Sequence, residues 1–248
     1  MLENILIPLA FFFLSFVVLE DDHCEKWQKY SFKYGIQLEQ LTDIFRGHGY
    51  HLVPFTNSDE DSDAYLKIRN NECYSSEYIK LYANGKLQKE NDCRKTCKFR
   101  AKSMESLASL NLFIVLDTGE FVGWVSVGKL SDKNSKGAGI AYMMWQRYSG
   151  YKMKCHRHHL LTEVLGKVIS AVELLKERGV FSADFLYATV HPENIKSTKV
   201  LEKNGFSSDG RMSNALWGLR KIYKRPLKKC FFKAFSCNSK PLLYVPSG

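Results

Sequence analysis

The segment from Ala188 to Phe206, ATVHPENIKSTKVLEKNGF, limits what this chain can fold into more than any other part of the sequence. Its beginning belongs to an apolar, strand-like run from Phe185 to Val190. Pro192 fixes the backbone after that run and excludes a helix that starts too early. The residues from Asn194 to Lys203 then have helical character, and Gly205 permits a sharp exit from the helix. The segment therefore predicts a strand, a short turn and a short helix in direct succession.

Further strands and one long helix are predicted before this segment. The sequence FIVLDTGEFVGWVSV reads as two apolar strands joined by a turn, with Gly119 where a positive φ is tolerated. The other predicted elements are a strand-like Ala64–Arg69, the hairpin strands Leu112–Leu116 and Phe121–Val127, a strand Ile140–Trp145, an amphipathic helix Leu161–Glu177 and a strand-prone Ala215–Leu219. This order predicts the α/β (α+β) class, with a mixed sheet in a three-layer domain.

Composition shifts divide the chain into three parts. Residues 56–63, TNSDEDSD, are acidic and turn-rich, which predicts a linker. Residues 1–63 form a hydrophobic and acidic N-terminal extension, with helical spacing between Cys24 and Leu52. We expect the main domain over residues 64–225 and a basic tail over residues 226–248.

Three blocks of the main domain resemble the GNAT superfamily of N-acetyltransferases, and more narrowly its RimJ/RimL-like branch. They are the hairpin Phe113–Val127, the strand Ile140–Trp145 and the segment His191–Phe206. The third block is the most specific, because the N-x-x-S-x-x-x-L-x-x-x-G-F pattern of the branch matches Asn194, Ser197, Leu201, Gly205 and Phe206. The resemblance implies a GNAT-like three-layer domain with a mixed, mostly antiparallel central sheet. It also implies an N-acyltransferase that moves an acetyl group from acetyl-CoA to an amine, on a protein or peptide.

The resemblance also assigns residues to the co-substrate. It places acetyl-CoA against the strand that includes Tyr142, Met143 and Met144, and its pyrophosphate on the loop and helix start that follow. The amide of Asn194 can offer a donor and an acceptor to the pantetheine arm. No metal is expected.

The loop that should bind the pyrophosphate departs from the pattern of the family. Residues 148–166 read YSGYKMKCHRHHLLTEVLG. If Thr162-Glu163 is matched to the helix start of the family, Arg157, His158 and His159 stand where a glycine-rich turn is usual. In the alternative alignment Gly150 belongs to that turn and the residues after it are an insertion. The side-chain charges of this loop can replace backbone access to phosphate. The alternatives are a metal site built on the same Cys and His residues, and an exposed basic loop in a domain that has lost cofactor binding.

The catalytic groups are partly implied by the same resemblance. Many GNAT enzymes use a tyrosine as proton donor at the position of Leu201, which has no proton to give. Ser197 is the candidate in its place, and a backbone N–H of the Tyr142–Trp145 strand is the candidate oxyanion donor. His191 and Glu193 are candidates for the base, as is Glu120 on the hairpin turn.

The charge of the chain is unevenly distributed. Residues 1–63 hold four Lys or Arg against eleven Asp or Glu, whereas residues 210–248 hold nine Lys or Arg and no acid. This asymmetry predicts an acidic partner for the C-terminal region, such as RNA or the ribosome, and the simpler alternative is a basic tail that keeps the protein in solution.

The cysteines and the apolar run near the N-terminus bear on the cellular location of the protein. Seven cysteines at irregular spacing, with an unmatched Cys93/Cys97 pair, favour reduced thiols and a cytoplasmic location over a disulfide framework or a zinc site. The apolar run Ile5–Leu19 contains Pro8 and is short for a spanning helix. Membrane association through this run is the alternative.

Two functions from different classes are compatible with these residues. The first is the acetyl-CoA-dependent N-acetyltransferase described above. The second is a catalytically inactive GNAT-like module that binds protein or RNA, because a fold does not by itself establish a reaction.

Overall fold

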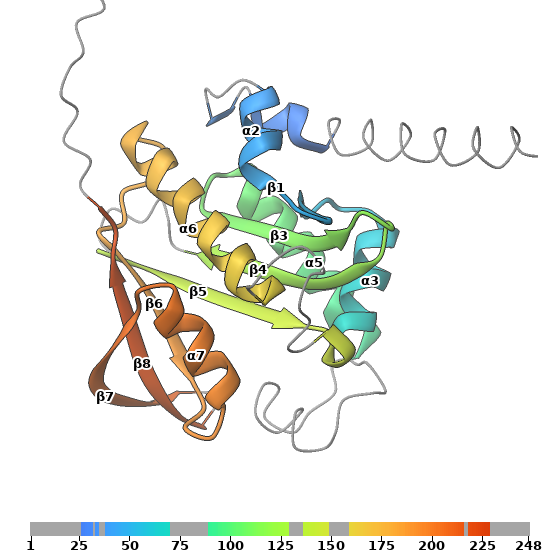
Figure 1. The fold of residues 1–248 in the computed structure, drawn as a ribbon. Helices are drawn as coiled ribbons and strands as arrows, with labels where there is room; N and C mark the ends of the chain where they lie inside the picture. Colours follow the sequence, from blue (N-terminus) through green and yellow to red (C-terminus); the bar gives the residue numbers. More distant parts are fainter. Residues whose placement is uncertain are drawn as a thin grey trace, which may run out of the picture.

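A single sheet with helices on both faces makes up the part of the chain that the structure describes (Figure 1). The structure is a computed structural model, and it describes residues 26–31, 33–34, 38–69, 89–128, 136–148, 159–215 and 218–228. The helices are α2 (Leu38–Phe45), α3 (Asp59–Arg69), α5 (Glu90–Glu105), α6 (Leu160–Glu177) and α7 (Ile195–Lys203), with a 3-10 turn at Gln146–Tyr148. The strands are β1 (Arg46–Gly47), β2 (Tyr50–Pro54), β3 (Ser109–Leu116), β4 (Phe121–Gly128), β5 (Gly137–Met144), β6 (Phe185–Val190), β7 (Ser207–Ala215) and β8 (Gly218–Pro226).

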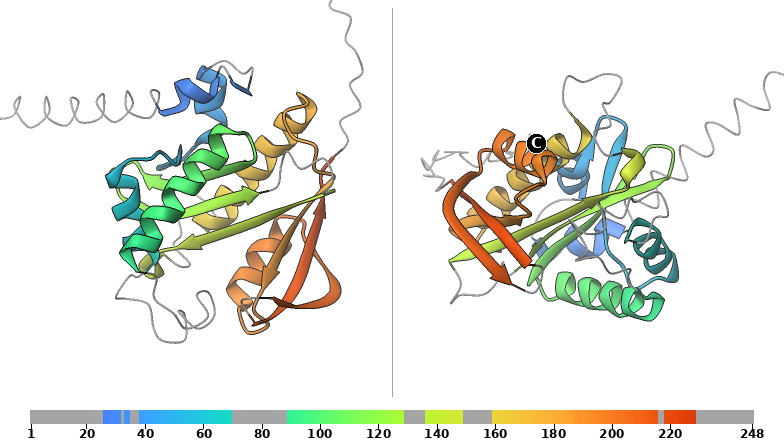
Figure 2. Two further views of the ribbon diagram at one scale, coloured as in Figure 1. Left: turned by 180° about the vertical axis from the view of Figure 1, so that it is seen from behind. Right: turned by 90° about the horizontal axis from the view of Figure 1, so that it is seen from below.

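The strand order gives the predicted class. Among the described residues the sheet has eight strands in the order β1-β2-β3-β4-β5-β6-β8-β7, and of these only β5 and β6 pair in parallel. Figure 2 shows α3 and α5 on one face of the sheet and α6 and α7 on the other. The prediction of a three-layer domain with a mixed, mostly antiparallel sheet is therefore confirmed.

Alternating side chains of the strands build two cores, one on each face. On β3, Leu112 and Ile114 belong to the core under α6, whereas Phe113 and Val115 belong to the core under α3 and α5. This follows from the period of two in a strand, which sends successive side chains to opposite faces. Burial on both faces explains why β3 is apolar over nearly its whole length.

The N-terminal part of the described chain packs into the core under α6. The Trp27 ring stacks on Phe45 with centroids 4.4 Å apart, and its Nε1 donates to the Leu52 carbonyl at 3.1 Å. The Tyr34 ring lies edge-on to Phe181, at 6.3 Å. The division of the chain at residue 63 stays a prediction, but both the sheet and the core include residues from either side of it.

Helix α3 corrects two expectations at once. Residues 59–63 were expected in a linker and Ala64–Arg69 in a strand, yet Asp59–Arg69 is one helix. Ser58 caps it, because its Oγ accepts the Asp61 N–H at 3.1 Å. Three acids in the first turn stabilise the helix, because they lie at the positive end of its dipole. The buried Asp61, Tyr65 and Ile68 follow a helical spacing.

The remaining sequence expectations of the described part are largely confirmed. The β3–β4 hairpin turns at Gly119 with a φ of 82°, and α6 and β6 have nearly the predicted bounds. Gly205 has a φ of 76° and ends α7, as expected. The expected strand Ala215–Leu219 is divided instead: Ala215 ends β7 and Gly218 begins β8, whereas residues 216–217 lie outside the described part.

Helix α5 was not predicted, and it buries two cysteines. Cys93 and Cys97 are fully buried and lie one helical turn apart, in the core under α3 and α5. Burial raises the pKa of Cys93 to about 11 and that of Cys97 to about 12. Both thiols therefore stay protonated at neutral pH in the folded protein.

We expect the native protein to protect both thiols from alkylation at pH 8. Peptide mapping by mass spectrometry after iodoacetamide treatment should find Cys93 and Cys97 modified at least about tenfold more slowly than in the urea-unfolded chain, because only the exposed thiolate reacts quickly. Equal rates in the two states would contradict the buried placement.

Among the described residues, no helix is both long and apolar enough to cross a membrane. The run Ile5–Leu19, on which the alternative of membrane association rests, lies outside the described residues.

Candidate functional site

Strands β5 and β6 separate from each other and leave an opening in the sheet. They pair in parallel at only three positions, from Gly137 opposite Phe185 to Gly139 opposite Tyr187. Both strands then continue without pairing with each other, and Figure 1 shows that they diverge. Their diverging ends line a cavity of about 400 Å³. Since such an opening exposes strand edges that a sheet normally covers, it is the first candidate for a binding site.

The ladder between β4 and β5 fixes which backbone groups face this opening. The Trp145 N–H, just after β5, donates to the carbonyl of Val122 in β4 at 2.7 Å. Successive residues of a strand direct their backbone groups to opposite edges. The N–H groups of Met144 and Tyr142 are therefore directed to the edge of β5 that faces β6.

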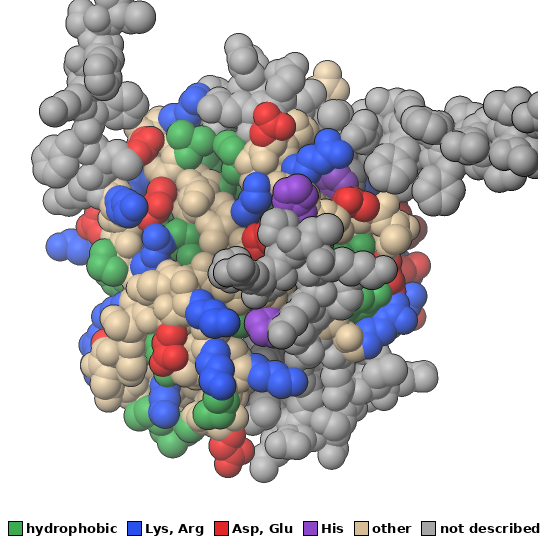
Figure 3. Space-filling view, viewed as in Figure 1, with side chains coloured by type: hydrophobic (Ala, Val, Ile, Leu, Met, Phe, Trp, Pro, Cys, Tyr) green, Lys and Arg blue, Asp and Glu red, His purple; other side chains and the backbone are tan. Residues whose placement is uncertain are grey.

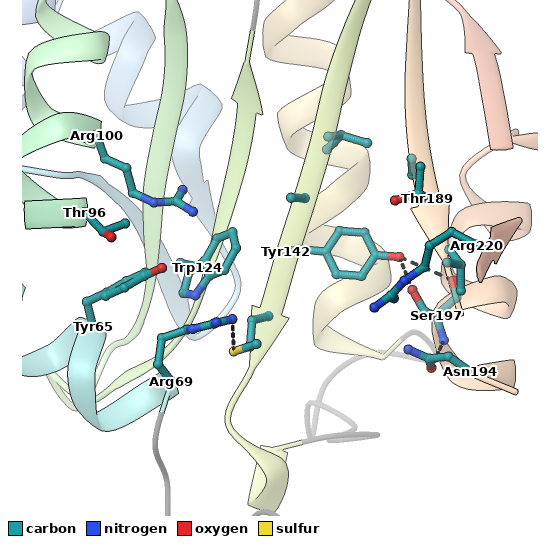
Figure 4. Close-up of a pocket in the computed structure, with 15 residues that line it drawn as sticks. Tyr65, Arg69, Thr96, Arg100, Trp124, Tyr142, Thr189, Asn194, Ser197 and Arg220 are labelled. Atoms are coloured by element: carbon teal, nitrogen blue, oxygen red, sulfur yellow. Dashed lines mark hydrogen bonds between the residues drawn. The ribbon is translucent and has the colours of Figure 1, made fainter. Parts of the chain in front are cut away.

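One half of the cavity is built from polar groups of β5 and α7 (Figure 4). Asn194 caps α7, because its Oδ1 accepts the Ser197 N–H at 3.1 Å. The Tyr142 hydroxyl lies 2.7 Å from the Ser197 Oγ and also donates to the Ser197 carbonyl at 3.3 Å. Since Asn194 and Ser197 are both buried, this group of hydroxyl and amide atoms is held rigidly beside the opening.

The other half of the cavity lies against α3 and α5. Figure 4 shows its residues on the opposite side of β5 from Ser197: Tyr65, Arg69, Thr96, Arg100 and Trp124. The Arg100 guanidinium lies over the Trp124 ring at 4.2 Å from its centroid. Arg69 Nη1 donates to the Met143 Sδ at 3.9 Å. This half therefore combines aromatic faces with cationic groups.

The predicted co-substrate residues have different surroundings. Tyr142, Met143 and Asn194 line the cavity, whereas Met144 is buried in the core under α6 and can face the opening only with its backbone. His159 occupies the residue before α6, and its carbonyl accepts the Thr162 N–H at 2.9 Å. Arg157 and His158 lie outside the described residues.

The predicted catalytic residues do not all lie at the cavity. Ser197 lines the cavity. His191 and Glu193 lie in the turn between β6 and α7 and are not among the cavity residues; the Glu193 N–H donates to His191 Nδ1 at 3.3 Å. Glu193 is exposed. The geometry thus brings Ser197 to the opening and leaves these two candidate bases beside it.

Glu120, the third candidate base, is engaged at the end of the β3–β4 hairpin. Its carboxylate accepts a hydrogen bond from the Tyr148 hydroxyl and forms an ion pair with Arg147. It is not among the residues that line the cavity. Its contacts hold the 3-10 turn after β5 against the hairpin.

Acids neutralise part of the basic C-terminal region within the described residues. Asp209 pairs with Arg211 at 2.7 Å and with Lys224 at 3.3 Å, and Glu173 pairs with Arg225 at 3.3 Å. Lys and Arg side chains gather over α7 and the β7–β8 hairpin, with acids among them (Figure 3). The association of this region with RNA or the ribosome stays a prediction, and residues 229–248 lie outside the described part.

The sequence did not reveal the half of the cavity formed by α3 and α5. Tyr65 and Arg69 were assigned to a strand, and Thr96 and Arg100 stood in a segment that was not assigned to any element. The capping pattern Ser58-x-x-Asp61 was a usable signal for α3. The packing of Arg100 on Trp124 has no local signal, because the two residues belong to different elements.

The family of the chain is shown by comparison with known proteins. The sequence matches the acetyltransferase (GNAT) domain over residues 51–207. A comparison with curated proteins found no match.

Similar solved structures agree with the family match. The ribosomal-protein-S5-alanine acetyltransferase from Vibrio fischeri is 15% identical, with a TM-score of 0.57 over 75% of this chain and 97% of that chain. RimL, a ribosomal L7/L12 alpha-N-protein acetyltransferase in complex with coenzyme A, is 15% identical, with a TM-score of 0.57 over 73% and 96%. The microcin C7 self-immunity acetyltransferase MccE, in complex with acetyl-CoA and AMP, is 18% identical, with a TM-score of 0.55 over 73% and 93%. These similarities show a common fold, and since the family match covers more than half of the sequence, the chain belongs to the GNAT acetyltransferase family.

Proposed function

We propose that this protein is an acetyl-CoA-dependent N-acetyltransferase that acts on an amine of a protein or peptide. The observation that carries the proposal is the opening between β5 and β6, with the hydroxyls of Tyr142 and Ser197 beside it. The ribosomal-protein acetyltransferases of similar fold support a protein amine as acceptor.

The edge of β5 suits the arm of acetyl-CoA, which carries two amide groups. A peptide-like chain can add to a strand edge through backbone hydrogen bonds, as a further strand would. Asn194 keeps its Nδ2 donor available for such a chain, because its Oδ1 is used in the cap of α7. For the pyrophosphate we propose the first turn of α6 after His159, together with Arg157 and His158.

The groups around the opening can perform the steps that amide formation requires. Acetyl-CoA supplies the acetyl group as a thioester, so that a C–N bond forms and a C–S bond breaks. The backbone N–H of Met144 or Tyr142 donates to the carbonyl oxygen as negative charge develops there. Ser197, in hydrogen-bond contact with Tyr142, donates a proton to the departing sulfur.

The acceptor amine must lose its proton before it attacks. The described residues that line the cavity include no carboxylate and no histidine, but they include Arg69, Arg100 and Arg220. Cationic neighbours disfavour a protonated amine and lower its pKa. An α-amine, with an ordinary pKa of about 7.7–8.0, then needs little further help, whereas lysine, at about 10.4, does. We therefore infer an α-amine as acceptor, with His191 and Glu193 as groups that could receive the proton outside the cavity.

Calorimetry with acetyl-CoA and mass spectrometry of peptides with free or blocked N-termini test the function. Binding of acetyl-CoA, followed by a mass gain of one acetyl group on the free N-terminus, would support the proposal. If acetyl-CoA does not bind at high micromolar concentration, the enzyme proposal fails and a non-catalytic module takes its place.

Asn194→Asp separates the two roles that we assign to Asn194. Aspartate caps a helix about as well as asparagine, so the free energy of unfolding should stay the same. The amide donor is lost, so the Kd for acetyl-CoA should rise about five- to tenfold, the effect of one hydrogen bond. Calorimetry and urea unfolding measure the two quantities.

Asn194→Ala is the companion variant. It removes the cap as well as the amide, and should therefore cost about 1 kcal/mol of stability in addition to affinity. If Asn194→Asp binds acetyl-CoA as tightly as the unchanged protein, Asn194 has only its capping role.

A further inference from the structure

The part of the cavity on the α3 and α5 side has a marked excess of positive charge. Three arginines and no Asp or Glu are found among the described residues that line the cavity. Two of the three, Arg69 and Arg100, lie on this side of β5 (Figure 4). Since a cavity with walls of low polarity concentrates the field of its charges, an anionic ligand is favoured there and a cationic one is disfavoured.

Arg100 is the residue that points most strongly to an anionic ligand, because no carboxylate of the described residues forms an ion pair with it. Its Nη1 donates to the neutral Asn111 Oδ1 at 3.2 Å, and its buried Nε has no hydrogen-bond partner among the described residues. A half-buried guanidinium without a counter-charge is unfavourable unless a ligand supplies one.

Aromatic rings hold the guanidinium of Arg100 in place. It lies 4.2 Å from the Trp124 ring centroid and 5.5 Å from those of Phe55 and Tyr65. Stacking uses the faces of a guanidinium and leaves its edge N–H groups able to donate in the plane. Since Nη1 donates to Asn111 and Nε is buried, Nη2 is the nitrogen left to donate to a carboxylate oxygen.

The position of Arg100 relative to β5 sets the distance between the anion and the reacting amine. Trp124, under the guanidinium, stands opposite Met143 of β5 in the sheet register. Neighbouring strands are about 4.8 Å apart, so Arg100 stacks on a ring of the strand next to β5, at whose far edge acetyl transfer is proposed. An acidic side chain of the residue that carries the amine, or of the next residue, is the group placed nearest to this position.

The co-substrate is not the natural source of the counter-charge. Its pyrophosphate is assigned to the first turn of α6, and α6 lies on the opposite face of the sheet from α3 and α5 (Figure 2). Arg100 is thus separated from that position by the sheet.

From these observations we propose that the acceptor carries a carboxylate close to its amine, that this carboxylate binds Arg100, and that the source is an acidic residue at the N-terminus of a peptide. This inference rests on the proposed N-acetyltransferase function. It selects acidic N-termini within that function and excludes lysine-rich acceptors.

Short peptides that are identical beyond their first residue, which is Glu, Gln or Lys, test the preference. We expect kcat/KM for the Glu peptide to exceed that for the Gln peptide about tenfold, the effect of one charged hydrogen-bonded contact. The Lys peptide should be the poorest acceptor. Free glutamate forms a fourth arm: acetylation as efficient as that of the Glu peptide would overturn the peptide source.

Variants of Arg100 connect the preference to this residue. Arg100→Gln should bring the Glu and Gln peptides within about threefold of each other, and Arg100→Glu should reverse the order of the Glu and Lys peptides. Lys98→Gln is the matched control, because it removes one positive charge from an exposed position of the same helix. It should leave the preference unchanged, and thermal unfolding of each variant verifies that it is folded.

Equal or better use of the Gln and Lys peptides by the unchanged protein would overturn the inference, as would a preference that survives in folded Arg100→Gln. Calorimetry with the same peptides distinguishes this result from a failure of the proposed function. If acetyl-CoA does not bind, the function fails, whereas tighter binding of the Glu peptide than of the Gln peptide still supports the anion site.

Discussion

Ser197→Ala is expected to lower kcat for acetyl transfer about 100-fold at pH 7 while KM for acetyl-CoA changes little. Ser197 lines the opening between β5 and β6, and its Oγ is 2.7 Å from the Tyr142 hydroxyl. Removal of a positioned proton donor costs typically 10²–10⁴ in rate, and a thiolate, which leaves readily, should fall at about the lower end. The cap of α7 uses the Ser197 backbone N–H and is retained in the variant.

The pH profile identifies the role as proton donation. The factor by which Ser197→Ala lowers kcat should become smaller as the pH rises, because at higher pH the thiolate can leave without a proton. Tyr142→Phe should cause a similar loss, and the double variant should lose less than the product of the two, because the two hydroxyls share one hydrogen bond.

Ser170→Ala, the same substitution on an exposed position of α6, is the matched control and should keep full activity. If both Ser197→Ala and Tyr142→Phe keep kcat within about threefold, the hydroxyl pair does not supply the proton and a solvent molecule must do so.

Gly123→Ala is expected to have the largest effect on stability. A Cβ at Gly123 would stand 2.5 Å from the Met143 carbonyl oxygen and 2.8 Å from the Met144 Sδ. The first of these contacts is with backbone of β5, which cannot turn aside as a side chain could. We expect a loss of about 2–3 kcal/mol in the free energy of unfolding, measured by urea denaturation.

The same change should weaken the binding of acetyl-CoA, because it displaces the part of β5 whose amides face the opening. Gly128 provides the matched control at the other end of β4, where a Cβ would meet no atom within 4 Å. Gly128→Ala should leave stability unchanged or raise it by about 0.4–1 kcal/mol, since alanine restricts the unfolded chain. Wild-type stability of Gly123→Ala would contradict the close approach of the two strands.

Together these variants address separate elements of the proposed site. In the proposed roles, Gly123 sets the position of β5, Ser197 and Tyr142 handle the proton, and Asn194 binds the arm of acetyl-CoA. Arg100 belongs to the acceptor side and should affect the choice of peptide more than the affinity for acetyl-CoA. A different readout for each residue allows the roles to be tested one at a time.

The segment that ends at Phe206 could be predicted well because its signals are local. Pro192 restricts the backbone, Gly205 permits the positive φ that ends the helix, and Asn194 caps the helix that it begins. Such preferences act over a few residues and do not depend on the rest of the chain. The hairpin around Gly119 and helix α6 were predictable for the same reason.

The error at α3 has a different cause. Six residues, AYLKIR, alternate in a way that suits a strand, and the acidic residues before them resemble a linker. Helix α3 depends on the Ser58 cap at its start and on the burial of Asp61, Tyr65 and Ile68 along its length. When a short segment fits both patterns, the surface on which it packs determines whether it forms a helix or a strand.

The sequence by itself determined the family, the strand-turn-helix unit at Ala188–Phe206 and the presence of Asn194 and Ser197 at its turn. Only the tertiary structure decided that the hydroxyl of Tyr142 meets Ser197, 55 residues away, and that Arg100 lies on Trp124. The physical reason is that these contacts depend on the order of the strands and on the opening between β5 and β6. Local backbone preferences do not encode strand order, because it is set by the burial of whole faces of the sheet.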